Sequence, residues 1–324
     1  VATSGDTGAA AIDAIKGKKN LNIFVLHPHN RISPVQRKLM TTGKDENVFN
    51  IAVKGNFDDC QNLVKSMFSD KEFSNQINMS GVNSINWARI IAQSVYYFYC
   101  YFLAEDDNQP INFSVPTGNF GDVYAGYLAK KLGLPINKLI VATNQNDILH
   151  RAISKGKYEA KHVSETISPS MDIQIASNFE RLIYDLNNHD SSQTLDDMKN
   201  IKQNGKYTID VEKLKKINQD FLSARISEQE TLDVIKNIYE KFNMVLDPHT
   251  AIGYGAFDKH DLKGNNIVLA TAHPCKFPDA ILKAINLKSD LPDELKFILD
   301  EKENYGIIEN NLKEIKQYIL GKIK

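Results

Sequence analysis

Three stretches of the chain combine glycines with hydroxyl, amide or carboxyl side chains beside an expected strand. The first, residues 3–11, has the sequence TSGDTGAAA and lies between a short β-prone stub and an expected helix. Free backbone N–H groups at a helix N-terminus, with hydroxyls beside them, suit an anion such as a carboxylate. The candidate contacts are Ser4, Gly5, Asp6 and Thr7. An ordinary capped helix start explains the same residues, so this stretch alone leaves both interpretations open.

The second stretch, residues 117–122, has the sequence TGNFGD and directly follows an expected strand at 111–115. A strand, a glycine-rich loop and a helix in this order are typical of a phosphate cradle. The sequence lacks the glycine spacing of a dinucleotide-binding loop and the lysine of a Walker loop. A plain turn needs fewer glycines, so we favour a phosphate site. Its candidate contacts are Gly118, Asn119, Phe120, Gly121 and Asp122.

The third stretch, residues 271–277, has the sequence TAHPCKF and follows an expected strand at 267–270. Ligands of α/β sheets bind at this end of the strands. The hydroxyl of Thr271 could face the nitrogen of a heterocycle. His273 could be catalytic, but we favour a structural histidine before a proline. Lys276 is interpreted as a surface lysine at a helix start.

Two further motifs mark helix starts. An expected helix that runs to about Leu103 opens with the polar residues Asn83, Ser84, Asn86 and Arg89. Asn86 and Arg89 would share one face with Gln93, and such a polar stripe with an arginine suits a phosphate or carboxylate ligand. A stripe facing solvent is the alternative, although the apolar residues around it favour a buried helix. The other motif, DPHTA at 247–251, predicts a helix with proline in its first turn, and the sequence alone assigns it no chemistry.

Apolar strand patterns alternate with helical patterns along most of the chain. This alternation predicts an α/β fold with parallel sheets and flanking helices. A mostly helical insertion is expected at about 147–242, and only helices are expected after 270. The expected strands are 21–26, 48–53, 111–115, 139–142 and 267–270. Between them a helix is expected at 34–40, opened by Ser33 as N-cap and Pro34 in the first turn, and another at 57–68.

Composition excludes several classes of protein. The 324 residues have a net charge of -1, 42% hydrophobic residues and 24% charged residues. This balance gives no sign of a nucleic-acid or membrane-surface binder. The three cysteines are widely spaced, which argues against a metal site and predicts a reducing compartment, the cytoplasm. No stretch is apolar enough over the required length to span a membrane.

Taken together, the motifs resemble the threonine synthases of the longer bacterial and fungal form. The matching stretches occur in the family's order over nearly the whole chain and read TSGDTGAA at 3–10, ISPVQ at 32–36, NSIN at 83–86, TGNFGD at 117–122, DPHTA at 247–251 and TAHPCKF at 271–277. Cys275 stands where the family usually has alanine, and the turn at His29-Asn30 usually contains glycine. Both departures are tolerable, because cysteine is small and asparagine accepts a positive φ.

The resemblance implies a fold-type II pyridoxal-phosphate enzyme related to the tryptophan synthase β subunit. It implies a lyase of threonine biosynthesis that converts O-phospho-L-homoserine and water into L-threonine and phosphate. The TGNFGD loop would hold the cofactor phosphate, Thr271 would face the pyridine nitrogen, and the SGDTG loop would bind the substrate. Asn83, Ser84, Asn86 and Arg89 would be further contacts. Residues 1–80 would belong to the smaller, substrate-side domain and 81–324 to the large cofactor-binding domain.

In this family the lysine that binds the cofactor covalently precedes the SGDTG loop. We therefore expect residues upstream of Val1 in the parent protein, and an inactive chain without them. Lys54 and Lys276 do not match that position, and the catalytic residue is left unassigned. Cysteine synthases and serine or threonine dehydratases are the nearest alternatives of the same fold. They have asparagine where Asp6 stands, and their phosphate-binding loops contain more glycine than residues 118–121. Both differences favour the threonine synthases. A related phospholyase that makes 2-oxobutyrate and a non-catalytic ligand-binding fragment remain open, and the oligomeric state is not predicted.

Overall fold

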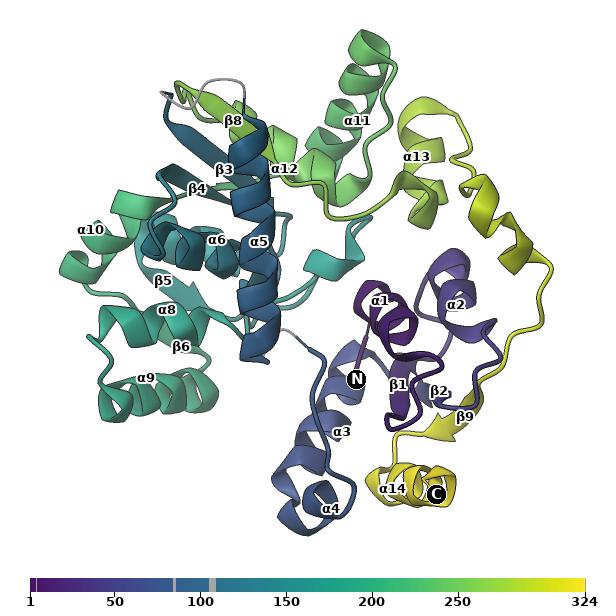
Figure 1. The fold of residues 1–324 in the computed structure, drawn as a ribbon. Coiled ribbons are helices and arrows are strands. Elements are labelled where there is room, and N and C mark those ends of the chain that lie inside the picture. The colour runs from purple at the N-terminus through teal and green to yellow at the C-terminus, as the bar shows by residue number, and fades with distance from the viewer. Residues whose placement is uncertain (4, 84–85, 105–108, 324) are drawn as a thin grey trace. The chain divides into compact units, whose positions relative to one another are not determined.

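The computed structural model describes residues 1–3, 5–83, 86–104 and 109–323. The chain forms two compact units. Residues 1–86 and 290–324 make the first unit, and residues 87–289 make the second. Figure 1 shows the elements of both units along the chain. No helix in the described ranges has the length and apolar character needed to cross a membrane.

The first unit is built on a parallel sheet with the strand order β1-β2-β9. Ala2 adds a parallel bridge to Leu26 of β1. The strands are β1 (Ile23–Pro28), β2 (Val48–Lys54) and β9 (Gly306–Glu309). The helices are α1 (Asp6–Ile15), α2 (Pro34–Thr41), α3 (Phe57–Ser69), α4 (Lys71–Gln76) and α14 (Leu312–Lys322), with a 3-10 helix η3 (Asp293–Leu299).

Local signals start the helices of this unit where the sequence predicts them. The Ser33 side chain accepts a hydrogen bond from the Gln36 amide, and Pro34 occupies the first turn of α2. Helix α3 begins with a capping box in which the Asn56 and Asp59 side chains each bond the other's amide. Such caps satisfy amides that have no partner within the helix. The predicted helices at 34–40 and 57–68 are therefore confirmed within one residue.

The second unit contains a four-stranded parallel sheet with the order β7-β4-β3-β8 (Figure 1). The strands are β3 (Ile111–Pro116), β4 (Ile136–Thr143), β7 (Phe221–Arg225) and β8 (Asn265–Val268). Around the sheet lie α5 (Trp87–Leu103), α6 (Gly121–Lys131), α7 (Ile148–Lys155), α8 (Phe179–Leu186), α9 (Ser191–Asn204), α10 (Val211–Asp220), α11 (Glu228–Phe242), α12 (Pro248–Asp258) and α13 (Pro278–Ile285). Short elements are β5 (Lys157–Glu159), β6 (Lys206–Thr208), η1 (Pro169–Met171) and η2 (Pro274–Lys276).

Hydrophobic cores cover both faces of the central strands. Leu139 and Val141 of β4 pack into the cluster that holds α6 and α7, whereas Ile140 and Ala142 pack into the cluster that holds α12. Side chains of a strand alternate between faces, so a strand buried on both sides must be apolar throughout. This arrangement confirms the predicted α/β class with parallel sheets.

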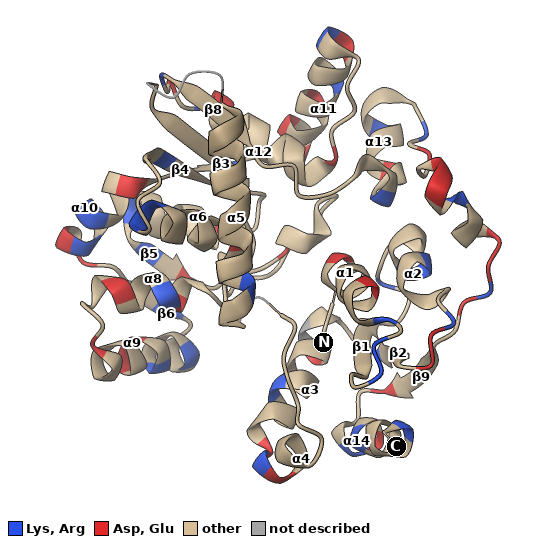
Figure 2. Ribbon diagram, in the orientation of Figure 1, with Lys and Arg blue, Asp and Glu red and all other residues tan. Residues whose placement is uncertain are grey.

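Helix α5 differs from its prediction. Ile90 and Tyr97 are fully buried, but Val95, Tyr99 and Phe102 are 60%, 63% and 76% exposed. The expectation of a buried helix was therefore wrong for half of its surface, because the sheet and α6 cover only one side. Figure 2 shows that α5 carries almost no charged residues, unlike α9, α10 and α14.

The C-terminal segment also differs from its prediction. Residues 290–324 cluster with the first unit instead of continuing the large domain from residue 81. The reason is β9, a strand that the sequence analysis missed and that pairs in parallel with β2. The predicted helical insertion at 147–242 contains mostly helices, but it also holds the β5–β6 pair and β7. Because β7 pairs with β4, this segment is part of the main sheet.

Candidate functional site

The loop after β3 is held firmly to the sheet. The Thr117 amide donates to the Ala142 carbonyl at 2.8 Å, and the Thr117 hydroxyl donates to the Val115 carbonyl at 2.6 Å. A Cβ atom on Gly118 would lie 2.9 Å from the Ser170 carbonyl oxygen and 3.1 Å from the Met171 Cα. Only glycine permits this approach, because both contacts are to backbone atoms.

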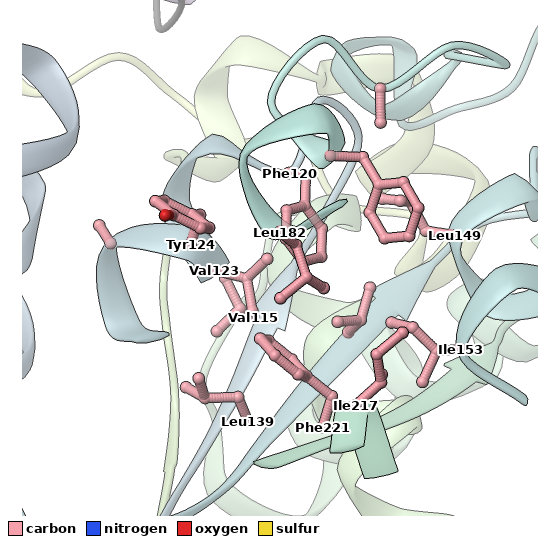
Figure 3. Packing of buried hydrophobic residues seen from close by; sticks show 14 of the residues in the cluster. Val115, Phe120, Val123, Tyr124, Leu139, Leu149, Ile153, Leu182, Ile217 and Phe221 are labelled. Carbon is pink, nitrogen blue, oxygen red and sulfur yellow. The ribbon is translucent and has the colours of Figure 1, made fainter. Parts of the chain in front are cut away.

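Phe120 is the strained residue of this loop. It caps α6 with φ 68° and ψ 6°, in the left-handed region. For a bulky residue this conformation costs roughly 1–3 kcal/mol and persists only where the surroundings impose it. They do so here, because the ring is fully buried and packs 5.2 Å from the Phe179 ring and 5.8 Å from the Phe221 ring. Figure 3 shows Phe120 in the same buried cluster as Leu182 and Phe221.

The backbone of the loop presents unused donors. Within the described part of the chain, the amides of Gly118 and Phe120 donate to no protein acceptor. The Gly121 amide donates to the Asn119 side chain at 2.8 Å, and the Asn119 carbonyl accepts from the Asn178 amide at 3.0 Å. Free amides beside the N-terminus of α6 form the donor set that an anion requires. The loop therefore fits a phosphate group.

The carboxyl group of Asp122 is engaged inside the protein. The hydroxyl of the buried Tyr97 donates to the Asp122 carbonyl oxygen at 2.9 Å and approaches its Oδ1 at 3.1 Å. Burial raises the pKa of Asp122 to about 6, against the opposing effects of the Tyr97 hydroxyl and the Arg89 charge. Asp122 is suited to support the loop, and its role as a cofactor contact stays a prediction.

Thr271 belongs to the same edge of the sheet. Strands β3, β4 and β8 run in parallel, so the residues that follow them gather at their carboxyl ends. The Leu269 amide still pairs with the Ser114 carbonyl at 3.0 Å, and the chain then leaves the sheet. Thr271 is exposed, and its hydroxyl has no protein partner in the described ranges. The Gly118–Asp122 loop and Thr271 thus follow neighbouring parallel strands at one edge of the sheet, and their role as cofactor contacts stays a prediction.

A polar network that the sequence analysis missed stabilises the loop after β4. The Asp172 Oδ1 atom accepts hydrogen bonds from Asn144 at 2.8 Å, Asn146 at 2.9 Å and the Thr166 hydroxyl at 2.7 Å. Asn144 and Asn146 are buried, and buried polar groups require such partners. The signal in the sequence was the polar run directly after the apolar strand β4.

The loop before α1 lies in the first unit. The Leu26 amide donates to the Val1 carbonyl at 2.8 Å and the Thr3 amide to the Leu26 carbonyl at 3.0 Å, which confirms the predicted strand stub. The Thr3 hydroxyl oxygen accepts from the amides of Gly5 and Gly8, both at 2.9 Å. Two donors of this loop are therefore already used by the protein itself. Ser4 lies outside the described residues.

Gln36 connects the ISPVQ motif to this loop. It is 1% exposed, and its Nε2 atom donates to the Asp6 Oδ1 atom at 3.2 Å. Gly5 has φ 134°, and a Cβ there would lie 2.7 Å from the Gln36 Cδ atom. The Gln36 Oε1 atom is buried without a partner among the described residues. The Thr7 hydroxyl likewise has no hydrogen-bond partner among the described residues, so Thr7 can still contact a ligand.

The NSIN motif is arranged differently from its prediction. The Asn83 side chain donates to the Ala2 carbonyl at 2.9 Å and accepts from the Ala2 amide at 3.4 Å, so it holds the strand stub. Asn86 precedes α5, and its side chain donates to the Gly81 carbonyl at 2.7 Å. The expected helical stripe of Asn86, Arg89 and Gln93 was therefore wrong at its first member, because α5 begins at Trp87. Ser84 lies outside the described residues.

Comparisons with known proteins agree with the motifs. Residues 250–319 match the family model described as threonine synthase, C-terminal. The chain is 43% identical to threonine synthase of Pseudomonas aeruginosa, over 98% of this chain and 68% of that protein. It is 35% identical to threonine synthase-like 2 of Xenopus laevis, over 91% of this chain and 63% of that protein.

A solved structure extends the agreement to the fold. The PLP-bound threonine synthase from Brucella melitensis superposes with a TM-score of 0.93 at 46% identity, over 99% of this chain and 69% of that chain. The fold is therefore that of the fold-type II pyridoxal-phosphate enzymes. The chain spans about two thirds of the length of these relatives.

Proposed function

Because the chain belongs to the threonine synthase family, a family of pyridoxal-phosphate-dependent lyases, we propose that the protein makes L-threonine. The substrates would be O-phospho-L-homoserine and water, and the second product would be phosphate. The observation that carries this proposal is the loop at 118–122, where Phe120 is strained and the amides of Gly118 and Phe120 have no acceptor among the described residues. A biosynthetic enzyme of this kind would work in the cytoplasm, in keeping with three free cysteines.

The residues of the second unit fit the cofactor. Bound pyridoxal phosphate would act as an electron sink for carbanions next to the substrate's amino group. The amides of Gly118 and Phe120 would donate to its phosphate, and Asn119, Gly121 and Asp122 would complete that loop. The Thr271 hydroxyl would donate to the pyridine nitrogen, which a neutral partner leaves unprotonated. Such fixed donors cost little reorganisation during the reaction.

The residues of the first unit would bind the substrate. The Thr7 hydroxyl and the N-terminal turn of α1 offer donors to a carboxylate, together with Ser4 and Gly5. The Gln36 side chain donates a hydrogen bond to the Asp6 carboxylate, so the negative charge of Asp6 faces a partner within the protein. Asn83 would act through the strand stub that leads into the loop. Ser84 and Asn86 are further proposed substrate contacts of this unit, and Arg89 is a proposed substrate contact of the second unit.

Neither lysine near the motifs is proposed to bind the cofactor covalently. Lys54 is exposed at the end of β2, and its Nζ atom lies 2.5 Å from the Glu309 Oε1 atom. Lys276 is half-buried in η2, next to the buried Cys275. We propose that the lysine of the family position serves this purpose. Borohydride reduction of the 324-residue chain with pyridoxal phosphate, followed by peptide mass spectrometry, should give no lysine adduct, and an adduct would refute this assignment.

The product assay decides the activity. The full-length protein with pyridoxal phosphate and O-phospho-L-homoserine should release threonine and phosphate in equal amounts. Formation of 2-oxobutyrate instead would identify a phospholyase, which the lower identity to the threonine synthase-like 2 protein disfavours. If the protein binds the cofactor but forms neither threonine nor 2-oxobutyrate, it is a non-catalytic binding protein.

A further inference from the structure

The DPHTA motif forms a buried hydrogen-bonded turn at the start of α12. Asp247 is 1% exposed and His249 is 3% exposed. The Asp247 Oδ1 atom accepts from the amides of His249 and Thr250 at 2.8 and 3.3 Å, and from the His249 ring at 3.1 Å. The Thr250 hydroxyl donates to Oδ2 of the same carboxylate. A helix cap needs only the amide contacts, so the buried imidazole is an addition that the cap does not explain.

Both nitrogens of the His249 ring are occupied. Its Nε2 atom lies 3.3 Å from the Ser170 amide, which can only donate. Nε2 must therefore accept, and the ring proton must lie on Nδ1, where it is donated to Asp247. With both positions engaged, His249 has neither a free lone pair nor a free proton for a substrate. Acid–base catalysis by this ring is excluded by its geometry, and a positioning role is left.

The partners of His249 lie behind the two predicted cofactor contacts. Ser170 is the residue whose carbonyl oxygen would lie 2.9 Å from a Cβ on Gly118, so it packs directly against the phosphate loop. On its other side the His249 ring lies 4.7 Å from the ring of Phe277, which is 6% exposed. Phe277 ends the TAHPCKF stretch that begins at Thr271. One imidazole thus contacts the supports of both stretches.

We propose that the Asp247–His249 pair is a positioning unit that holds the phosphate loop and the Thr271 stretch in register for the cofactor. This proposal rests on the proposed function for the identity of the ligand. Asp247 sets the tautomer and orientation of the ring, His249 holds the η1 turn against Gly118, and Phe277 transmits the same contact to the segment after β8. Ligand supports of this kind affect affinity strongly, because small displacements of donors weaken every bond they make.

Two substitutions at His249 separate its contacts. His249→Phe keeps a ring against Phe277 but loses both hydrogen bonds. His249→Gln keeps an acceptor for the Ser170 amide. The matched control is Asp190→Ala, since Asp190 caps α9 through the amides of Ser192 and Gln193 at an exposed site.

The probe is pyridoxamine 5'-phosphate, which binds without a lysine, titrated into the 324-residue chain by calorimetry. We expect His249→Phe to weaken binding about 10-fold or more, His249→Gln to weaken it less, and Asp190→Ala to leave it unchanged. Hydrogen exchange of the Thr117 and Gly121 amides, which are hydrogen-bonded within the protein, should accelerate without ligand in His249→Phe alone. Folded His249→Phe protein with unchanged affinity and unchanged exchange would overturn the proposal.

If His249→Phe does not fold, Asp247→Asn replaces it, because asparagine keeps an oxygen for the cap amides but weakens the hold on the ring. Asp247→Asn should bind pyridoxamine 5'-phosphate more weakly than the Asp190→Ala control, and its loop amides should exchange faster. Wild-type affinity together with wild-type exchange rates would overturn the proposal. The product assay is independent of these readouts. A wrong substrate would leave the His249 effects in place, whereas a wrong positioning role would leave the product unchanged.

Discussion

The loops before α1 and before α6 follow the same plan of strand, glycine-rich turn and helix, yet they use their amides differently. In the first loop the Thr3 hydroxyl occupies the amides of Gly5 and Gly8. In the second loop the amides of Gly118 and Phe120 have no protein acceptor in the described ranges, and the buried Phe120 ring imposes a left-handed backbone. The second loop thus presents two free amides to an anion, whereas the first has already bonded two of its amides inside the protein.

The largest effect should come from the ring that imposes this conformation. Phe120→Ala removes a fully buried ring from contacts with Phe179 and Phe221. We expect the free energy of unfolding, measured by urea denaturation, to fall by about 3–5 kcal/mol. Phe120→Leu retains most of the apolar volume and should cost clearly less. Equal losses in the two variants would show that the ring does not hold the loop.

Two buried groups, one in each unit, should make opposite contributions to stability in acid. Burial lowers the pKa of His27, in β1, to about 4. Between pH 4 and 6.5 the His27 ring is therefore protonated in the unfolded chain but not in the folded one. Stability from this group is present above pH 6.5 and is lost as the pH falls towards 4, by roughly 3 kcal/mol. Burial raises the pKa of Asp122 to about 6, so the folded second unit gains stability as the pH falls from 6 towards 3.8.

Hydrogen exchange of each unit between pH 4 and 6.5, corrected for intrinsic rates, measures this contrast. His27→Phe should reduce the acid loss of stability in the first unit, and Asp122→Asn should increase the acid loss in the second, because each variant removes one contribution. Identical pH profiles in variant and parent would contradict the assignment to these two groups.

A methyl group at matched glycines should separate ligand binding from stability. Gly118→Ala forces a Cβ against the Ser170 and Met171 backbone and should weaken pyridoxamine 5'-phosphate about 30-fold, or about 2 kcal/mol. Gly5→Ala meets Gln36 at a positive φ and should lower the stability of the first unit by about 1–3 kcal/mol without changing that affinity. If Gly118→Ala and Gly5→Ala bind pyridoxamine 5'-phosphate with equal affinity, the proposed difference between the two loops is wrong.

The smallest effect should be at Thr3. Thr3→Val removes the acceptor of two amides and should cost about 1–2 kcal/mol of unfolding free energy. Thr3→Ser keeps the oxygen and serves as the control. If the α1 amides were bonded mainly to water, the valine and serine variants would be equally stable.

The sequence by itself determined the local units of this protein. The alternation of apolar strands and amphipathic helices predicted the parallel sheets, and Ser33-Pro34 predicted the start of α2. The order of the motifs predicted the family, and the glycine-rich loop after β3 predicted where a phosphate would bind. These features depend on residues close together in the chain, where periodicity and capping act.

Only the tertiary structure decided how distant residues use their side chains. Asn83 bonds Ala2 instead of capping α5, β9 joins β2 instead of forming a helix, and His249 bonds the turn behind Gly118. These partners are separated by about 80 to 250 residues, so no local pattern records them. Polar side chains take the nearest unsatisfied partner that folding brings to them, and the sequence does not show which partner that will be.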